Sequence, residues 1–335
     1  MTPAASATLV APFRVTWDMT ARCNLHCRHC YNSSSTQAPS PEHLLRIAEE
    51  LADSKIFFIS LSGGEPLMEP ALWDIINAFK ENKKIIQLIS NGTLITPSIA
   101  RKIKTHGVDF IQISLDGLKE THEYQRGVPG CFEKTINAIT YLREEGVSVT
   151  VNTLVTQKNK DEIADIIQLL IDLGVREYRT TRLIVMGRGT GLQPEVLTPQ
   201  QTHALITEIL KLRTRYLGLI DIIPDECMCF LGEEIRQYGL EWYGCPAGRT
   251  ECAVDAAGNV YPCVFLTYAN FCMGNVITSS FDDIWCSEKF ESFRQIERSC
   301  NCPITDFCKG GCIAAAYARY GDIYRKDPYC WRDEE

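Results

Sequence analysis

Two periods of hydrophobic spacing alternate along the first two-thirds of the chain. Short apolar runs bounded by polar residues are typical of buried parallel strands, and apolar residues three and four apart are typical of helices with one packed face. The pattern predicts strands over residues 13–17, 56–61, 85–89, 110–115, 147–154 and 177–184. It predicts helices over residues 41–52, 71–79, 98–105, 131–144, 160–173 and 199–216, with residues 186–200 as a loop.

Strands that alternate with helices predict a parallel α/β fold with right-handed crossovers. Gly107, Gly146 and Gly174 each follow a predicted helix, where a glycine can end it. In parallel barrels the chemistry lies at the carboxyl ends of the strands. The polar segments directly after the predicted strands are therefore the candidates for a site.

Composition narrows the class of protein. The 335 residues suit one large domain and a small one, and the net charge of −8 does not indicate a nucleic acid or an anionic membrane as partner. No apolar stretch approaches the 18 or more residues of a membrane span. The first twelve residues lack the features of a secretory signal. We therefore expect a cytoplasmic protein.

The sixteen cysteines fall into two groups. Three lie in the first 30 residues, Cys131 follows alone, and twelve lie from Cys227 onward. Disulfides are rare in the cytosol, so metal ligation is the expected use of so many thiols.

The first group has the spacing C-x3-C-x2-C. Cys23, Cys27 and Cys30 are followed by Tyr31. Three thiolates on one short loop can hold three irons of a 4Fe–4S cluster and leave the fourth iron open. A zinc site is the alternative, because His26 or His29 could provide a fourth ligand.

This motif resembles that of the radical S-adenosylmethionine (SAM) superfamily. The resemblance implies that the open iron binds SAM, which is cleaved to a 5′-deoxyadenosyl radical. It also implies that the six repeats form a partial (β/α)6 barrel. We expect a tail over residues 1–12, the barrel over 13–216, a bridging segment over 217–244 and a small cysteine-rich domain over 245–335.

Motifs at the predicted strand ends resemble the SAM-binding segments of this superfamily. Gly63-Gly64-Glu65-Pro66 follows the second strand, and a carboxylate there would pair with the amino group of SAM. The resemblance assigns Ser114 and Arg126 to the SAM carboxylate, which suits an arginine fork. The predicted cofactor-binding residues are Tyr31, Gly63, Gly64, Glu65, Ser90, Ser114, Asp116, Arg126 and Asn152.

Some polar residues at these strand ends also have a structural interpretation. Ser90, Asp116 and Asn152 could instead cap a helix or close a turn, and Arg182 could line the barrel or form a structural pair. Gly187-Arg188-Gly189 is similar to a segment that often follows this strand, although such a tripeptide means little alone. No catalytic acid or base is identified.

The second cysteine group resembles the SPASM domain, which holds two auxiliary 4Fe–4S clusters. The resemblance assigns one cluster to Cys245, Cys252, Cys263 and Cys312. It assigns the outer cluster to Cys300, Cys302, Cys308 and Cys330. The first gap of the later quartet is one residue instead of the usual two, and a pair of zinc ribbons is the alternative. Roles are not assigned to Cys131, Cys227, Cys229, Cys272 and Cys286.

The resemblance leaves several substrates open. It predicts modification of a ribosomally made precursor peptide by crosslinking, epimerisation or excision. Haem-precursor modification is the alternative, and a non-catalytic iron–sulfur electron carrier is another. Sulfatase maturation is disfavoured because Val264, not aspartate, follows Cys263. Expected partners are the peptide, a separate leader-recognition protein, and a reductant such as ferredoxin or flavodoxin.

Overall fold

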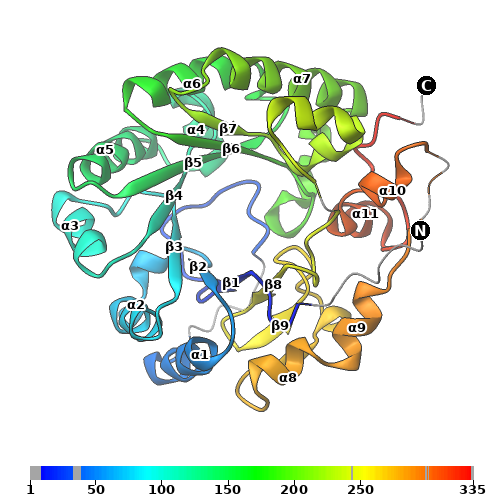
Figure 1. Cartoon of the computed structure of the whole chain (residues 1–335). Helices are drawn as coiled ribbons and strands as arrows, with labels where there is room; N and C mark the ends of the chain where they lie inside the picture. The colour runs from blue at the N-terminus through cyan, green and yellow to red at the C-terminus, as the bar shows by residue number, and fades with distance from the viewer. Residues whose placement is uncertain (1–8, 33–38, 243, 299, 301, 333–335) are drawn as a thin grey trace.

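A ten-stranded sheet organises the whole chain. The computed structural model describes residues 9–32, 39–242, 244–298, 300 and 302–332, without the side chains of residues 226 and 227. Neighbouring strands follow the order β10-β9-β8-β1-β2-β3-β4-β5-β6-β7. The strands from β1 to β7 pair in parallel with their chain neighbours, as the sequence predicts. Seen end-on, the sheet curves into an incomplete ring with the helices outside it (Figure 1).

The strands are short and close to their predicted positions. They are β1 (Arg14–Asp18), β2 (Phe58–Ser62), β3 (Ile85–Ser90), β4 (Phe110–Ser114), β5 (Ser148–Val155), β6 (Glu177–Arg182), β7 (Asp221–Ile223), β8 (Glu251–Val254), β9 (Asn259–Tyr261) and β10 (Gly274–Asn275).

Apart from α4, the barrel helices have nine or more residues, whereas the helices of the last third have eight or fewer. The α-helices are α1 (Pro41–Asp53), α2 (Leu72–Glu81), α3 (Pro97–Thr105), α4 (Lys119–Arg126), α5 (Cys131–Glu144), α6 (Ile163–Asp172), α7 (Pro199–Arg215), α8 (Phe281–Trp285), α9 (Glu288–Arg294), α10 (Thr305–Cys308) and α11 (Ile313–Tyr320). The 3₁₀ segments are η1 (Pro66–Met68), η2 (Lys160–Glu162), η3 (Gly187–Glu195), η4 (Glu226–Tyr238) and η5 (Ala269–Phe271). Among the described residues, no helix is long and apolar enough to cross a membrane.

The sequence accounts for helix α1 in detail. Ser40 caps its first turn by accepting a hydrogen bond from the His43 amide, and Pro41 has the backbone angle that a first turn needs. Its buried face packs against the sheet through Leu44, Ile47 and other apolar residues of the core. Burying such side chains stabilises the fold by about 1.5–3 kcal/mol each.

The predicted α/β barrel is confirmed, with three additions. Helix α4 was not predicted, because it is strongly polar and only 8 residues long. The loop predicted over residues 186–200 contains η3. Strand β7 pairs with β6 and continues the sheet into the segment predicted as a bridge. The domain boundaries stay a prediction.

The cysteine-rich last third joins the barrel through backbone pairing. Strand β8 lies parallel to β1 with Cys252 opposite Val15, and β9 and β10 extend the sheet antiparallel. The buried Asp327 adds a second connection, because it accepts hydrogen bonds from Arg182 of β6 (2.6 Å) and from the Cys312 amide (2.8 Å). The barrel and the C-terminal region therefore share one continuous core.

Candidate active site

The segment after β1 carries the first cysteine group and lies within the ring of strands (Figure 1). The Gly64 amide donates to the Thr20 carbonyl (2.6 Å) and the Glu65 amide to the Arg22 carbonyl (2.8 Å). A methyl group at Gly64 would lie 2.1 Å from the Arg22 oxygen, and one at Gly63 would lie 2.4 Å from the Thr20 oxygen. Only glycine permits this close approach of two backbones.

Two further segments hold the other end of the cysteine loop. The Arg28 amide donates to the Gln125 carbonyl at the end of α4 (2.9 Å). The Arg188 amide donates to the Cys30 carbonyl (2.9 Å), and its guanidinium donates to the Cys27 carbonyl (3.1 Å). Gly187 approaches so closely that an added methyl group would lie 2.6 Å from the Cys30 oxygen. The Gly-Arg-Gly tripeptide thus fixes the loop from the end of β6.

The three thiols of the loop lie in one small buried cluster. Cys27 is buried, whereas Cys23 and Cys30 are half-buried, and all three pack with Leu25 and Cys131. The Leu25 amide donates to the Cys23 sulfur (3.4 Å), and a buried guanidinium, that of Arg126, donates to the Cys27 sulfur (3.6 Å). The Leu25 amide favours a Cys23 thiolate, although burial raises the pKa of Cys23 overall.

Arg126 belongs to a buried charged network. Its guanidinium lies 2.7 Å from the Asp116 carboxylate, whose other oxygen accepts from the Leu154 amide (3.0 Å). Although burial alone would raise the pKa of Asp116, the Arg126 guanidinium holds this pKa below its usual value. The His29 Nε2 lies 3.5 Å from Asp116, and burial lowers the pKa of His29 to about 4. His29 therefore faces Asp116 as a neutral imidazole.

Glu65 is fully buried at the end of β2. Its carboxylate accepts hydrogen bonds from the Ser90 hydroxyl (2.9 Å), the Asn91 amide (2.9 Å) and the Leu67 amide (3.3 Å). Burial raises the pKa of Glu65 to about 7 despite these donors. A cation bound nearby would stabilise the ionised carboxylate.

The remaining predicted polar residues lie on adjacent strand ends. Ser114 of β4 is opposite Asn152 of β5, and the Asn152 amide donates to the Thr181 hydroxyl of β6 (3.1 Å). All three side chains are half-buried. The structure thus brings Ser114 and Asn152 together, whereas Ser90 is joined to Glu65.

Tyr31 connects the cysteine loop with the C-terminal region. Its hydroxyl lies 3.1 Å from both oxygens of Asp18, and its ring meets Phe265 edge-on with the centroids 5.1 Å apart. Burial raises the pKa of Asp18 to about 6. Phe265 follows Cys263 by two residues, so this contact joins the two cysteine regions.

The eight cysteines that the resemblance assigns to the two auxiliary clusters, here called the array, line two separate cavities. A cavity of about 130 Å³ is lined by Cys245, Cys252, Cys263 and Cys312, together with Arg182, Thr181 and other residues. A cavity of about 10 Å³ is lined by Cys300, Cys302, Cys308 and Cys330. These are the two sets that the resemblance assigns to two clusters.

The comparisons with known proteins agree with these motifs. Residues 17–170 match the radical SAM superfamily, and residues 245–312 match the SPASM iron–sulfur cluster-binding domain. The AdoMet-dependent heme synthase of Methanosarcina barkeri is 30% identical to this chain over 96% of both chains. The chain belongs to the radical SAM superfamily. The Mycofactocin maturase MftC of Mycolicibacterium smegmatis is also 30% identical, over 96% of this chain and 83% of the maturase.

Solved radical SAM structures share the fold. Streptococcus suis SuiB bound to S-adenosylmethionine has a TM-score of 0.78 at 19% identity, covering 97% of this chain and 78% of SuiB. Native anSMEcpe with AdoMet and the Cp18Cys peptide has a TM-score of 0.77 at 20% identity, covering 96% and 94%. At this identity the likeness is one of fold. As a radical SAM enzyme, the chain uses a 4Fe–4S cluster and SAM.

The radical SAM loop fits its cluster by the chemistry of its donors. All fifteen described cysteines are free thiols. Among the described residues, no three His, Cys, Asp or Glu side chains are arranged around a single metal ion. Each cysteine of a 4Fe–4S cluster binds a different iron, so its ligands lie farther apart than those of one ion. Cys23, Cys27 and Cys30 would hold three irons of the cluster.

The first SPASM set, the four cysteines Cys245, Cys252, Cys263 and Cys312 of the larger cysteine-lined cavity, is also suited to binding a metal cluster. The Cys312 thiol donates a hydrogen bond that lowers the pKa of Cys245 to about 6, favouring a thiolate there. The Cys312 sulfur itself accepts from the Ala315 amide at the start of α11 (3.4 Å). Thiolates are the form in which cysteine binds metals.

Sequence reasoning missed several residues of the site. Asp18 contacts the Tyr31 hydroxyl and His122 accepts a hydrogen bond from the Asp116 amide, but neither was predicted, and Cys229 was given no role. The Cys229 sulfur lies 3.5 Å from that of Cys308, and both are buried. Asp18 could have been found because it ends a strand, but nothing local in the sequence indicates that Cys229 meets Cys308 across 79 residues. Cys227 has no described side chain.

Arg182 forms structural ion pairs with two carboxylates, as one of the two interpretations of the sequence predicts. It is buried, with Asp225 at 2.7 Å and Asp327 at 2.6 Å. It also borders the cavity of the first SPASM set, so its charge lies close to those cysteines.

Proposed function

We propose that this radical SAM enzyme modifies a ribosomally made precursor peptide. When bound, the cluster and SAM would supply a 5′-deoxyadenosyl radical for the removal of a hydrogen atom from the substrate. The observation that carries the proposal is the likeness to MftC maturases over 96% of the chain at 30–31% identity. MftC is named a maturase. The structure of SuiB bound to its precursor peptide SuiA has the same fold as this chain.

The protein's own residues have separate tasks in this proposal. Cys23, Cys27 and Cys30 hold the cluster of the barrel. Glu65 accepts the ammonium of SAM, and Arg126 holds its carboxylate while keeping Asp116 ionised. Tyr31 closes the loop against Asp18 and Phe265, which excludes water from the side that faces the array.

The eight array cysteines hold two auxiliary 4Fe–4S clusters, so we expect three clusters in the chain. Four cysteines line each of the two cavities, which supports two four-ligand sets. Anaerobic reconstitution followed by iron and sulfide analysis should give about twelve irons per chain. A folded protein with stoichiometric zinc and no iron would contradict this assignment.

The assignment of a peptide as substrate is tested by anaerobic incubation of the enzyme with SAM, a reductant and a genetically linked peptide. Mass spectrometry should show a changed peptide and 5′-deoxyadenosine. We also propose a separate leader-recognition protein and a ferredoxin or flavodoxin as reductant, and adding each should increase turnover. Incubation without peptide is the control for uncoupled SAM cleavage.

Haem-precursor modification is the second candidate. The heme synthase of Methanosarcina barkeri has the same identity and covers 96% of both chains, and a Pre-heme d1 synthase of Dinoroseobacter shibae is 25% identical. A mass change on a tetrapyrrole, with none on any linked peptide, would replace the peptide proposal by this one.

A further inference from the structure

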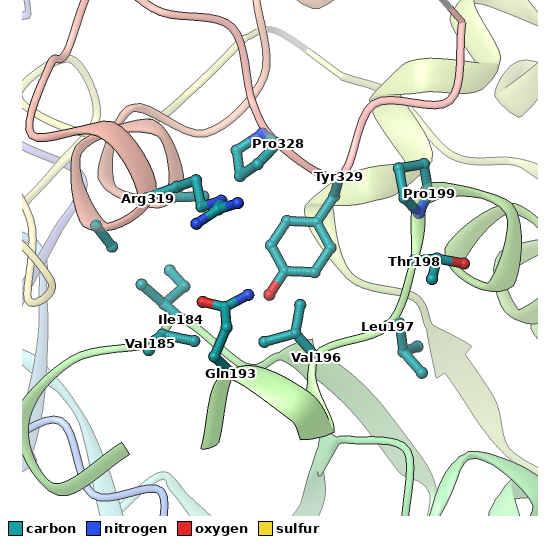
Figure 2. Close-up of a pocket in the computed structure, with 12 residues that line it drawn as sticks. Ile184, Val185, Gln193, Val196, Leu197, Thr198, Pro199, Arg319, Pro328 and Tyr329 are labelled. Atoms are coloured by element: carbon teal, nitrogen blue, oxygen red, sulfur yellow. The ribbon is translucent and has the colours of Figure 1, made fainter. Parts of the chain in front are cut away.

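A cavity of about 310 Å³ opens at the seam between the barrel and the C-terminal region. The larger part of its wall is apolar: Ile184, Val196 and Leu197 come from the barrel side, and Ala315 and Ala318 come from α11. Figure 2 shows the Tyr329 ring at the centre of the lining residues. This ring is fixed, because its hydroxyl donates to the Leu183 carbonyl. The cavity is therefore a formed site at a junction, where ligands commonly bind.

A cation, Arg319, lies at this cavity. Arg319, on the last turn of α11, lines the cavity and is exposed. Within the described part of the chain, no carboxylate or carbonyl pairs with its guanidinium. The nearby Arg325 lies outside the lining and stacks on Tyr320, 5.0 Å from the ring centre. A guanidinium fork with no partner in the described part of the chain, beside apolar side chains, suits a carboxylate that is attached to an apolar group.

The cavity is connected to the radical SAM loop by a single element. Segment η3 begins at Gly187, which packs on Cys30, and its residue Gln193 lines the cavity. Segment η3 is kinked at Leu192, so the stretch from Arg188 to Gln193 spans at most about 10 Å, at about 2.0 Å per residue. An extended peptide covers that length with about three residues.

We propose that this cavity anchors the substrate peptide by an apolar side chain that has a carboxylate close to it. The inference rests on the proposed peptide substrate. The apolar side chain enters between Val196 and Ala318, and Arg319 binds the carboxylate. Anchoring a few residues from the reacting position places one chosen residue of the peptide at the radical SAM site.

Binding is measured first, in the reconstituted enzyme without SAM, so that turnover plays no part. The probes are dansyl-Gly-Leu-Asp-amide and its matched neutral partner dansyl-Gly-Leu-Asn-amide. The Asp probe should bind about three- to tenfold more tightly to the parent enzyme, the range for an exposed charged hydrogen bond. Arg319→Gln should remove this preference, and Arg325→Gln, the matched control, should keep it.

A second variant tests the apolar half of the site. Ala318→Trp fills the cavity from a half-buried position and should weaken both probes. Equal affinity of the parent for the two probes, or an unchanged preference in Arg319→Gln, would overturn the inference. If coproporphyrin binds through Arg319 and neither peptide binds, the occupant is a tetrapyrrole and the peptide assignment is wrong.

The outcome also separates this inference from the proposed function. If the parent modifies a precursor peptide and Arg319→Gln does so with the same KM, the anchor is refuted while the function stands. If no peptide is modified but the Asp probe binds through Arg319, the function is refuted while the binding site stands.

Discussion

The two cysteine regions are held in place by different means. The barrel loop of Cys23, Cys27 and Cys30 is fixed by backbone hydrogen bonds from the ends of β2, α4 and β6, with glycines in close contact. The C-terminal array lies among short elements, such as the four-residue helix α10 and the two-residue strand β10. One site is built by the fold around it, whereas the other has little regular structure of its own.

This difference has a consequence for metal binding. A loop whose shape is fixed by its neighbours needs no metal to keep that shape. A segment built of short helices and strands gains much of its stability from metal ligation, because binding energy is then folding energy. We therefore expect removal of the clusters to leave the barrel folded and to loosen the array.

Replacing all three loop cysteines with alanine should have the largest effect. Cys23→Ala, Cys27→Ala and Cys30→Ala together remove every protein ligand of the radical SAM cluster, so SAM cleavage should fall to background. The barrel should stay folded, since these side chains lie on a loop that backbone bonds hold. Measuring 5′-deoxyadenosine by chromatography and secondary structure by circular dichroism checks both halves, and undiminished SAM cleavage would refute the assignment.

Removing the outer array ligands should cost less activity but more structure. The quadruple alanine variant of Cys300, Cys302, Cys308 and Cys330 should lose about four irons of about twelve. Proteolysis should then cut within residues 245–332 while the barrel stays protected. Equal protection of both regions would show that the array folds without this metal.

Alanine at Gly64 tests how the fold holds the loop. A methyl group there meets the Arg22 backbone at 2.1 Å, which forces the loop to shift at a cost of about 1–3 kcal/mol. SAM cleavage and iron at the loop should fall by about tenfold or more. Gly191→Ala is the matched control, because nothing lies within 4 Å of its added methyl group, and it should behave like the parent.

The smallest effect is a pH dependence of SAM binding. Burial places the pKa of Glu65 at about 7, so its carboxylate is mostly protonated at pH 6 and mostly ionised at pH 7.5. Since the ionised form binds the ammonium, SAM affinity should rise severalfold over this interval. Isothermal titration checks it. Glu65→Gln should bind SAM more weakly and show no such rise, and a parallel rise in both would exclude Glu65 as the cause.

Most of the barrel followed from local patterns. The limits of α5 were predicted to the residue, and each of the first six strands was found within about two residues. Helix α4 was missed because it has little apolar character: its stability depends on burying His122, Gln125 and Arg126 against the loop. Strand β7 has only three residues, too few for a period to show.

The candidate site divides in the same way. Cys23, Cys27 and Cys30 could be selected from spacing alone, because their ligand geometry is local. The contacts of Asp116 could not, since its partners Arg126, His29 and Leu154 come from three different segments. Arg188 was marked by its tripeptide, but its role in holding Cys27 and Cys30 became visible only in the fold.

The sequence by itself determined the superfamily, the parallel barrel and the cysteines that form each group, because metal spacing and hydrophobic period are encoded over a few residues. Only the tertiary structure decided that four array cysteines line each cavity and that Cys229 meets Cys308. It also placed Arg319, which has no ion-pair partner among the described residues, beside a cavity at the seam. These arrangements depend on contacts between residues far apart in the chain, which packing of the whole core brings together.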